Sequence, residues 1–172
     1  MPRRTILVLA ALLLWRAPLL AQGPSCTTNG CTITNTASAT VGDILRLSLN
    51  TASPTDLGTP VEADFDAGHK DAAGPTATVK ANRPWSVAVV GAAANFTYAG
   101  ALTDPNKPAT DLQWGTAAGT YGHDMGSSAV LFSGATGTSS ASQQVFYRTA
   151  FAYDKDVPGT YSLVVNFTLS AP

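Results

Sequence analysis

The sequence of residues 161–170 is YSLVVNFTLS, and this stretch decides the fold. Apolar side chains occupy every second position, at Tyr161, Leu163, Val165, Phe167 and Leu169. Successive side chains of a strand point to opposite faces, so this alternation predicts a strand with one buried face and one wet face.

The residues before this stretch predict its partner. Gln144–Tyr153 is rich in aromatic and β-branched residues, which favour strands. The intervening Val157–Thr160 contains Pro158-Gly159, and a type II turn needs such a glycine at positive φ. We therefore expect a C-terminal hairpin between Gln144–Tyr153 and Tyr161–Leu169.

The same alternation recurs upstream. Leu45–Leu49 alternates Leu with polar residues, and Ala77–Ala81 leads through Asn82-Arg83-Pro84 into Trp85–Val89, which predicts a second hairpin with Trp85 in the core. Shorter candidate strands are Cys31–Thr40, Val61–Phe65, Asn95–Ala99, Asp111–Trp114 and Ser128–Ser133. Small residues make Gly91–Ala94 and Gly134–Ser142 candidate loops. No segment has a sustained helical period, so about eight to ten short strands predict an all-β, antiparallel, immunoglobulin-like sandwich with Greek-key connections.

The N-terminus has the order of a signal peptide. Arg3 and Arg4 precede the apolar run 6–14, and a small residue, Ala21, stands before Gln22. We predict a signal peptide over 1–21 and a single β-sandwich domain over 22–172. The run is shorter than the roughly 20 residues of a membrane span, so no span is expected after cleavage; an uncleaved anchor is the alternative.

Charge excludes several partners. The chain has 10 basic and 11 acidic residues. Removal of the leader takes away Arg3, Arg4 and Arg16, which makes the domain more acidic. No basic field remains for nucleic acid or anionic lipid. We expect a secreted protein that is extracellular, on the cell surface or periplasmic.

The only two cysteines, Cys26 and Cys31, flank Thr27-Thr28-Asn29-Gly30. Close cysteines in an oxidising compartment predict a disulfide, and Asn-Gly suits the tight turn between them. A free or redox-active pair is the alternative.

An acidic cluster spans Glu62–Asp71. Asp64, Asp66 and Asp71 offer carboxylate oxygens to Ca²⁺, although their spacing is not that of an EF-hand. A solvated loop is the simpler interpretation, and no other cofactor is expected.

Other constellations give no convincing catalytic site. His123-Asp124 lies near Ser127 and Ser128, but a hydrolase triad does not need adjacency in sequence, and no Gly-x-Ser-x-Gly elbow is present. Trp114, next to Gly115, is the aromatic side chain that we expect at the surface as a glycan contact.

Two stretches support a family resemblance. Pro158-Gly159-Thr160-Tyr161, followed by the alternating strand, resembles the last strand of secreted bacterial sandwiches of the spore coat protein U and fimbrial-subunit type. Asn82–Val87 is loosely similar to a strand of those families and of Trp-x-Leu surface domains, although Trp85-Ser86-Val87 lacks the Leu. The resemblance implies an exported sandwich that assembles on the cell surface by lending a strand to a neighbour.

These observations favour a non-catalytic structural or adhesive protein whose partners are copies of itself or other surface proteins, bound through β-strand edges. Thr32–Thr40 is the candidate donor, and the alternative is an edge strand of its own domain. A monomeric module that binds Ca²⁺ or glycan is the second hypothesis, and a secreted hydrolase is the third.

Overall fold

The computed structural model describes residues 23–51 and 54–172. The chain divides into two units, Met1–Thr40 and Val41–Pro172. The predicted signal peptide and its cleavage point lie outside the described residues. In the first unit, residues 23–40 contain no strand, so the strand predicted over Cys31–Thr40 is wrong for this structure. The predicted disulfide Cys26–Cys31 is confirmed, and Gly30 in its turn has a φ of 80°.

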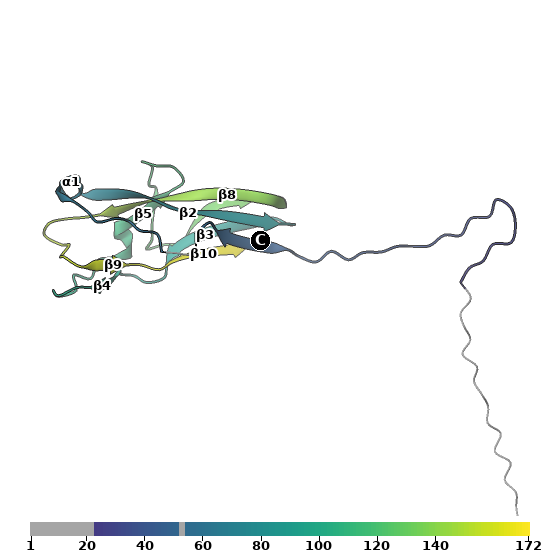
Figure 1. Ribbon diagram of the computed structural model, residues 1–172, viewed down its shortest axis with the longest axis horizontal. Coiled ribbons are helices and arrows are strands. Elements are labelled where there is room, and N and C mark those ends of the chain that lie inside the picture. Colours follow the sequence, from purple (N-terminus) through teal and green to yellow (C-terminus); the bar gives the residue numbers. More distant parts are fainter. Residues whose placement is uncertain (1–22, 52–53) are drawn as a thin grey trace, which may run out of the picture. The chain divides into compact units, whose positions relative to one another are not determined.

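The second unit contains ten strands among its described residues, with one short α-helix and one 3₁₀ turn (Figure 1). The elements are β1 (Leu45–Leu49), α1 (Glu62–Asp66), β2 (His69–Ala81), β3 (Trp85–Gly91), β4 (Thr97–Ala99), η1 (Ala109–Asp111), β5 (Leu112–Gly115), β6 (His123–Asp124), β7 (Ala129–Gly134), β8 (Thr138–Ala150), β9 (Thr160–Ser162) and β10 (Val165–Ser170).

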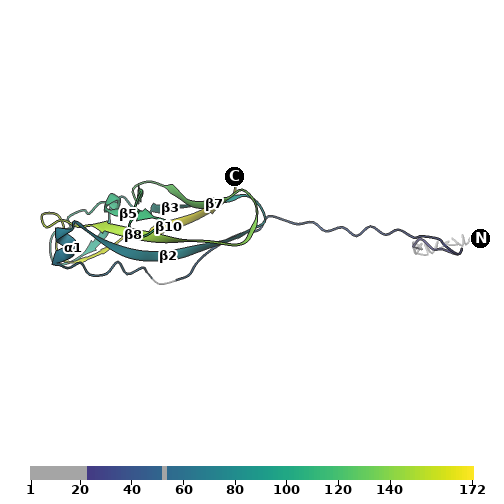
Figure 2. The same ribbon diagram turned by 90° about the horizontal axis from the view of Figure 1, so that it is seen from above.

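The strands form two main antiparallel sheets and a small third one. The first sheet has the order β1-β2-β8-β5-β6, the second β10-β3-β7, and β4 pairs with β9. Figure 1 shows β2 and β8 as one layer and β3 and β10 as the other, and Figure 2 shows α1 at the end of the unit opposite the C-terminus. The predicted all-β, antiparallel sandwich is confirmed.

The core lies between the two main sheets. Alternating side chains of β2, β3 and β8 face inward, and Val79, Val87 and Val145 are fully buried. Trp85, predicted for the core, is 3% exposed and meets Phe132 of β7 edge-on. Period-two patterning therefore identified the buried faces correctly.

Both predicted hairpins are wrong. β2 pairs with β1 and β8, whereas β3 pairs with β10 and β7, so Asn82-Arg83-Pro84 carries the chain from one sheet to the other. Likewise, β8 and β10 belong to different sheets. Gly159 is not among the glycines with positive φ, so the predicted type II turn is also absent from this described loop. Strand pairs that face each other across a core have the same sequence pattern as pairs within one sheet.

Two further expectations need correction. The predicted strand Val61–Phe65 is largely α1, in which the Asp64 carboxylate accepts the Val61 N–H at 2.9 Å. An acidic side chain at this position satisfies one of the free N–H groups of the first turn, which favours a helix start. The predicted loop Gly134–Ser142 instead contains the first residues of β8, which pair with β2.

The loop before β9 is fixed by Tyr161. Its hydroxyl donates to the Val157 carbonyl at 2.7 Å and accepts the Val157 N–H at 3.0 Å. A tyrosine that bonds backbone a few residues upstream is a feature of immunoglobulin-like sandwiches.

Candidate functional site

The two main sheets leave one pair of facing edges uncovered. β1 is the edge strand of its sheet and pairs only with β2, and β10 is the edge strand of the other sheet and pairs only with β3. Within the described residues, neither strand has a partner on its outer side. An unpaired edge presents free N–H and C=O groups to another strand.

Burial changes abruptly at these edges. On β3, Val87 and Val89 are fully buried, yet their inward-facing neighbours on β10, Phe167 and Leu169, are only partly buried. On β1, Leu45 is 38% and Leu49 39% exposed, although each is paired with a buried alanine of β2. The core therefore lacks a cover between β1 and β10.

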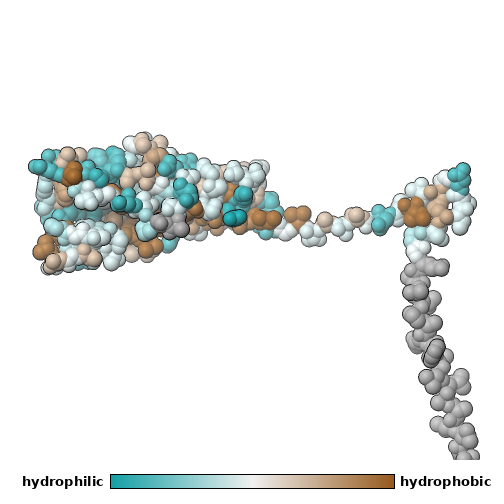
Figure 3. Space-filling model, in the orientation of Figure 1, coloured by the Kyte–Doolittle hydropathy of each residue, from teal (hydrophilic) through white to brown (hydrophobic). Residues whose placement is uncertain are grey.

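A groove of about 1190 Å³ lies at one end of this gap, where Leu49 of β1 and Val165 and Phe167 of β10 line it, and we call it the β1–β10 groove. Its apolar lining includes Leu49, Phe65, Tyr147, Phe151, Val165 and Phe167. Figure 3 shows brown apolar side chains among the teal and white ones on the face that it views. Burial beside the groove raises the pKa of Tyr147 to about 12, so its phenol stays neutral across the physiological range.

One polar group in the groove lacks a partner. The Thr149 side chain is 4% exposed and lines the groove, and its Oγ1 has no hydrogen bond among the described residues. A buried hydroxyl without a partner costs about 1–3 kcal/mol. An occupant that supplies a donor or acceptor there would recover that free energy.

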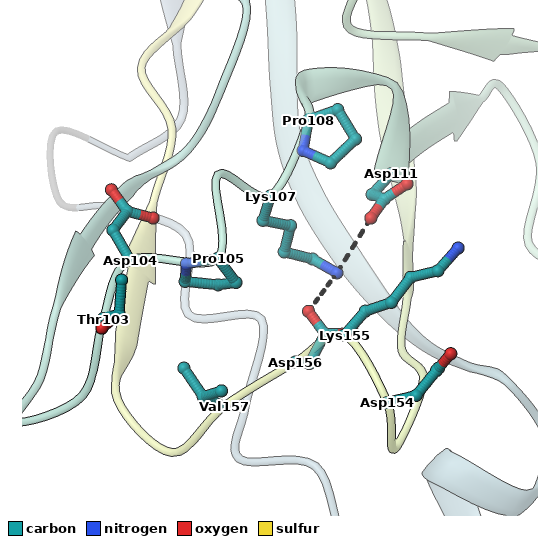
Figure 4. A pocket seen from close by; sticks show the side chains of 10 residues that line it. All are labelled: Thr103, Asp104, Pro105, Lys107, Pro108, Asp111, Asp154, Lys155, Asp156 and Val157. Atoms are coloured by element: carbon teal, nitrogen blue, oxygen red, sulfur yellow. Dashed lines mark hydrogen bonds and ion pairs between the residues drawn. The ribbon is translucent and has the colours of Figure 1, made fainter.

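Two members of a buried ion cluster, Lys107 and Asp156, line the groove. The Lys107 ammonium, 2% exposed, contacts Asp156 at 2.7 Å and Asp111 at 3.1 Å and donates to the Ala150 carbonyl at 2.6 Å. It also lies 5.0 Å from the centre of the Phe151 ring. Figure 4 shows Lys107 between the two carboxylates in an adjoining pocket of about 450 Å³. One ammonium serves two carboxylates and a carbonyl, so the cluster joins loops and keeps an excess negative charge.

The three predicted Ca²⁺ ligands do not converge. Asp64 pairs with Lys70 at 2.9 Å, and Asp66 accepts the Tyr153 hydroxyl at 3.1 Å. Asp71 forms two bonds to Arg148, at 2.7 and 2.9 Å, and these bonds hold the pKa of its carboxyl below the usual value. Within the described parts of the chain, no group of three or more His, Cys, Asp or Glu side chains is arranged to hold a metal ion.

The proposed glycan contact at Trp114 is wrong. Its side chain is fully buried, because β5 lies between β8 and β6 and Trp114 faces the core. His123 stacks on Trp114, with ring centres 4.7 Å apart. The Asp124 carboxylate accepts the Gly126 N–H at 2.8 Å, so the residues suggested for a hydrolase hold a turn and a ring stack instead.

Sequence reasoning missed two sets of functional residues. Lys107 and Asp156 are 49 positions apart, and no local pattern in the sequence links them. Asn82 and Arg83 were interpreted as turn residues, yet both bond the chain just before β1. For Asn82, the only signal is a polar residue directly after an alternating strand, which is common at strand ends.

Comparisons with known proteins give weak likenesses. No known family profile matches the chain, and no curated protein matches it. One similar solved structure is described as a chaperone-usher pilus whose structure reveals the basis of rod uncoiling; it is 16% identical, with a TM-score of 0.44 over 86% of this chain and 100% of that one. Another is the P pilus rod subunit PapA, 16% identical, with a TM-score of 0.41 over 81% of this chain and 100% of that one. At these values, the likeness carries no argument about function.

In the described residues, 23–51 and 54–172, no helix is long and apolar enough to cross a bilayer.

Proposed function

We propose that this protein is a non-catalytic structural subunit of a cell-surface assembly, and that its β1–β10 groove accepts an extended strand from a second copy. The observation that carries the proposal is the burial pattern: Leu45 and Leu49 of β1 are more than a third exposed and Phe167 and Leu169 of β10 are only partly buried, whereas Val79, Val87 and Val89 of the inner strands are fully buried. A strand inserted between β1 and β10 completes the core.

Two gains drive such insertion. Main-chain hydrogen bonds form along the free edges, each contributing about 0.5–1.5 kcal/mol net. Apolar side chains at alternate positions enter the groove, at about 0.8 kcal/mol for each buried CH₂ group. The inserted strand can also supply the hydrogen-bond partner that the Thr149 hydroxyl lacks.

The donor is the segment Thr32–Val41. Its alternate residues Ile33, Asn35, Ala37, Ala39 and Val41 form a mostly apolar face, and Thr34, Thr36, Ser38 and Thr40 form a hydroxyl-rich face. Ile33 is 47% and Val41 80% exposed, so the apolar side chains at both ends of this face are accessible. The polar face keeps the segment soluble until it pairs.

We place the assembly outside the cytoplasm. The predicted signal peptide over 1–21 directs export, and a disulfide such as Cys26–Cys31 persists in an oxidising compartment. Neither a Ca²⁺ site nor a glycan contact has geometric support, so we propose no second function.

The test compares two substitutions on neighbouring residues in the mature chain. Ala37→Asp puts a carboxylate on the apolar face of the donor, where burial costs several kcal/mol, and Ser38→Asp puts the same charge on the opposite face. Sedimentation velocity over a range of concentrations should show polymers for the wild type and Ser38→Asp, and monomers for Ala37→Asp.

Equal behaviour of both variants would contradict strand insertion, as would a wild type that stays monomeric at every concentration. Because both substitutions lie outside the unit Val41–Pro172, its melting temperature should be the same in both chains and serves as the control for folding.

A further inference from the structure

Two basic side chains lie side by side at one end of the first sheet. Arg46 of β1 is paired directly with Lys80 of β2, and both side chains are exposed on the outer face of the sheet. None of the ion pairs formed among the described residues includes either of them. Like charges directly opposite each other destabilise a sheet, so this pair has repulsion that an anionic partner would relieve.

An apolar side chain completes this surface. Ile44 stands two positions before Arg46, so alternation puts it on the same outer face, and it is 59% exposed. Arg83, three residues after Lys80, donates to the Pro172 carbonyl at 3.0 Å, which places this surface at the C-terminal end of the unit. We call Ile44, Arg46 and Lys80 the Arg46 patch.

The opposite end of the unit has a surface of the opposite charge. Figure 2 shows α1 at the end away from the C-terminus. On α1, Glu62 and Asp66 are exposed four positions apart, and no ion pair within the described part of the chain includes them. Like charges at this spacing destabilise a helix. The acidic pair therefore also has repulsion that a partner of opposite charge would relieve.

Apolar side chains accompany the acidic pair as well. Val61, which precedes α1, is 59% exposed, and Tyr153 is 65% exposed. The Tyr153 hydroxyl lies 3.1 Å from the Asp66 carboxylate, so this ring belongs to the same surface. We call Val61, Glu62, Asp66 and Tyr153 the α1 patch.

The proposed strand exchange brings the two patches together. Phe65 of α1 lines the groove, so the α1 patch borders one end of it. Ile44 follows Val41, the last donor residue, by only three positions. Because a chain spans at most about 3.6 Å per residue, Ile44 lies within about 11 Å of the point where the donor leaves the groove. The Arg46 patch of the donor copy therefore lies beside the end of the acceptor at which that exit occurs.

Charge selects that end. If the donor left the groove at the C-terminal end of the acceptor, the Arg46 patches of the two copies would meet, and four cations would repel one another. If the donor leaves beside α1, two cations meet two carboxylates. Opposite charges attract across an interface, whereas like charges exclude a partner. The charge distribution thus favours the exit beside α1.

We infer that the Arg46 patch of one copy docks on the α1 patch of the next copy, with its apolar side chain against Val61 and Tyr153 and its two cations facing the two carboxylates. The inference rests on the proposed strand exchange, and it adds a second contact that fixes the direction in which the donor strand enters. Docking removes exposed apolar side chains from water and relieves the like-charge repulsion of both patches.

The experiment reverses the charges of each patch in the mature chain. Arg46→Glu with Lys80→Glu makes both patches acidic, and Glu62→Lys with Asp66→Lys makes both basic. Measured by sedimentation velocity at low salt, the association constant of either double variant should fall by at least about tenfold, because like charges then face each other.

The matched control adds charge at the same end but on the other sheet. Ser86 of β3 is paired directly with Ser133 of β7. Ser86→Glu with Ser133→Glu therefore creates an acidic pair away from the Arg46 patch. This control should assemble like the wild type.

Two rescues separate docking from a folding defect. The variant with all four charge reversals has the net charge of the wild type and opposite charges on its two patches, so it should assemble like the wild type. An equal mixture of the two double variants should also assemble, because acidic and basic chains can alternate along the polymer. Misfolded chains would not be repaired in either way.

The outcomes are distinct. If the wild type and both double variants assemble equally well, the inference about the patches is wrong and strand exchange stands. If the double variants lose polymer and the fourfold variant does not regain it, the inference is also wrong. If the wild type never assembles, strand exchange fails, and the docking of the patches fails with it.

Discussion

At the scale of single residues, Lys107 has the most demanding environment in the described chain. Its ammonium is removed from water and surrounded by Asp156, Asp111 and a backbone carbonyl. Removing one partner of a buried pair leaves the other charge uncompensated. The cluster joins the loop before η1 to the end of β8 and to the loop that follows it.

We predict that Lys107→Met lowers the free energy of unfolding by about 3–5 kcal/mol, because the Asp156 carboxylate is only 6% exposed. Urea denaturation of the variant measures this loss. Lys155→Met is the matched control: Lys155 is exposed in the same loop, and its substitution should have little effect. Equal losses for the two variants would mean that the cluster does not stabilise the fold.

At the scale of the elements, charged pairs across strands add to the sheet. Asp71 of β2 lies directly opposite Arg148 of β8, and the guanidinium also lies 4.5 Å from the centre of the Tyr121 ring. The two bonds from Arg148 lower the pKa of Asp71 in the folded state. A lowered pKa in the folded state means that the charged carboxylate stabilises the fold. This stabilisation is lost as pH falls through that pKa.

The pair should therefore contribute stability at neutral pH and lose it below the ordinary Asp value of 3.8. The difference in unfolding free energy between the wild type and Asp71→Asn should be below about 1 kcal/mol, since the Asp71 side chain is 40% exposed, and it should vanish in strong acid. Urea denaturation at a series of pH values measures it, with Asp154→Asn as the control in an exposed loop. If the difference in unfolding free energy grew towards low pH, the Asp71–Arg148 pair would not be its cause.

The elements also show what one sequence can predict. Alternation located β1, β3 and β10 and their inward faces, because period two depends only on neighbouring residues. Strand partners were wrong, since nothing local in Asn82-Arg83-Pro84 distinguishes a turn within one sheet from a crossing between two. Trp114 was assigned to the surface from its neighbour Gly115, yet strands far away in the chain bury it.

The site was predicted only in part. The idea of strand exchange came from the family resemblance, and the donor was chosen because Thr32–Thr40 is polar and follows the disulfide. The groove depends on which edges remain unpaired, and this is a property of the assembled sheets. The contacts of Lys107 with Ala150 and Asp156, and those of Asn82 with the chain before β1, join positions about 40 residues apart or more.

At the scale of the whole molecule, we propose a domain completed by another chain, and the acidic residues considered for Ca²⁺ serve the fold itself. Asp64, Asp66 and Asp71 each have their own partner, so Ca²⁺ finds no shared site. A ligand that binds only the folded state raises its melting temperature.

We predict that Ca²⁺ at about 1 mM, a concentration that suits extracellular sites, leaves the melting temperature of the mature chain unchanged. Thermal denaturation with Ca²⁺ and with a chelator measures this. A rise that disappears in Asp71→Asn would instead restore the Ca²⁺ hypothesis.

The uncovered edges of β1 and β10 have a consequence for any polymer built from this chain. Under the proposed strand exchange, each copy gives one strand and receives one, so the contact is head-to-tail and does not close on itself by symmetry. The resulting fibre is polar: one terminal subunit has an empty groove, and the other has an unused strand. The two tips are therefore chemically different, and a reagent that recognises one of them would cap growth from a single direction.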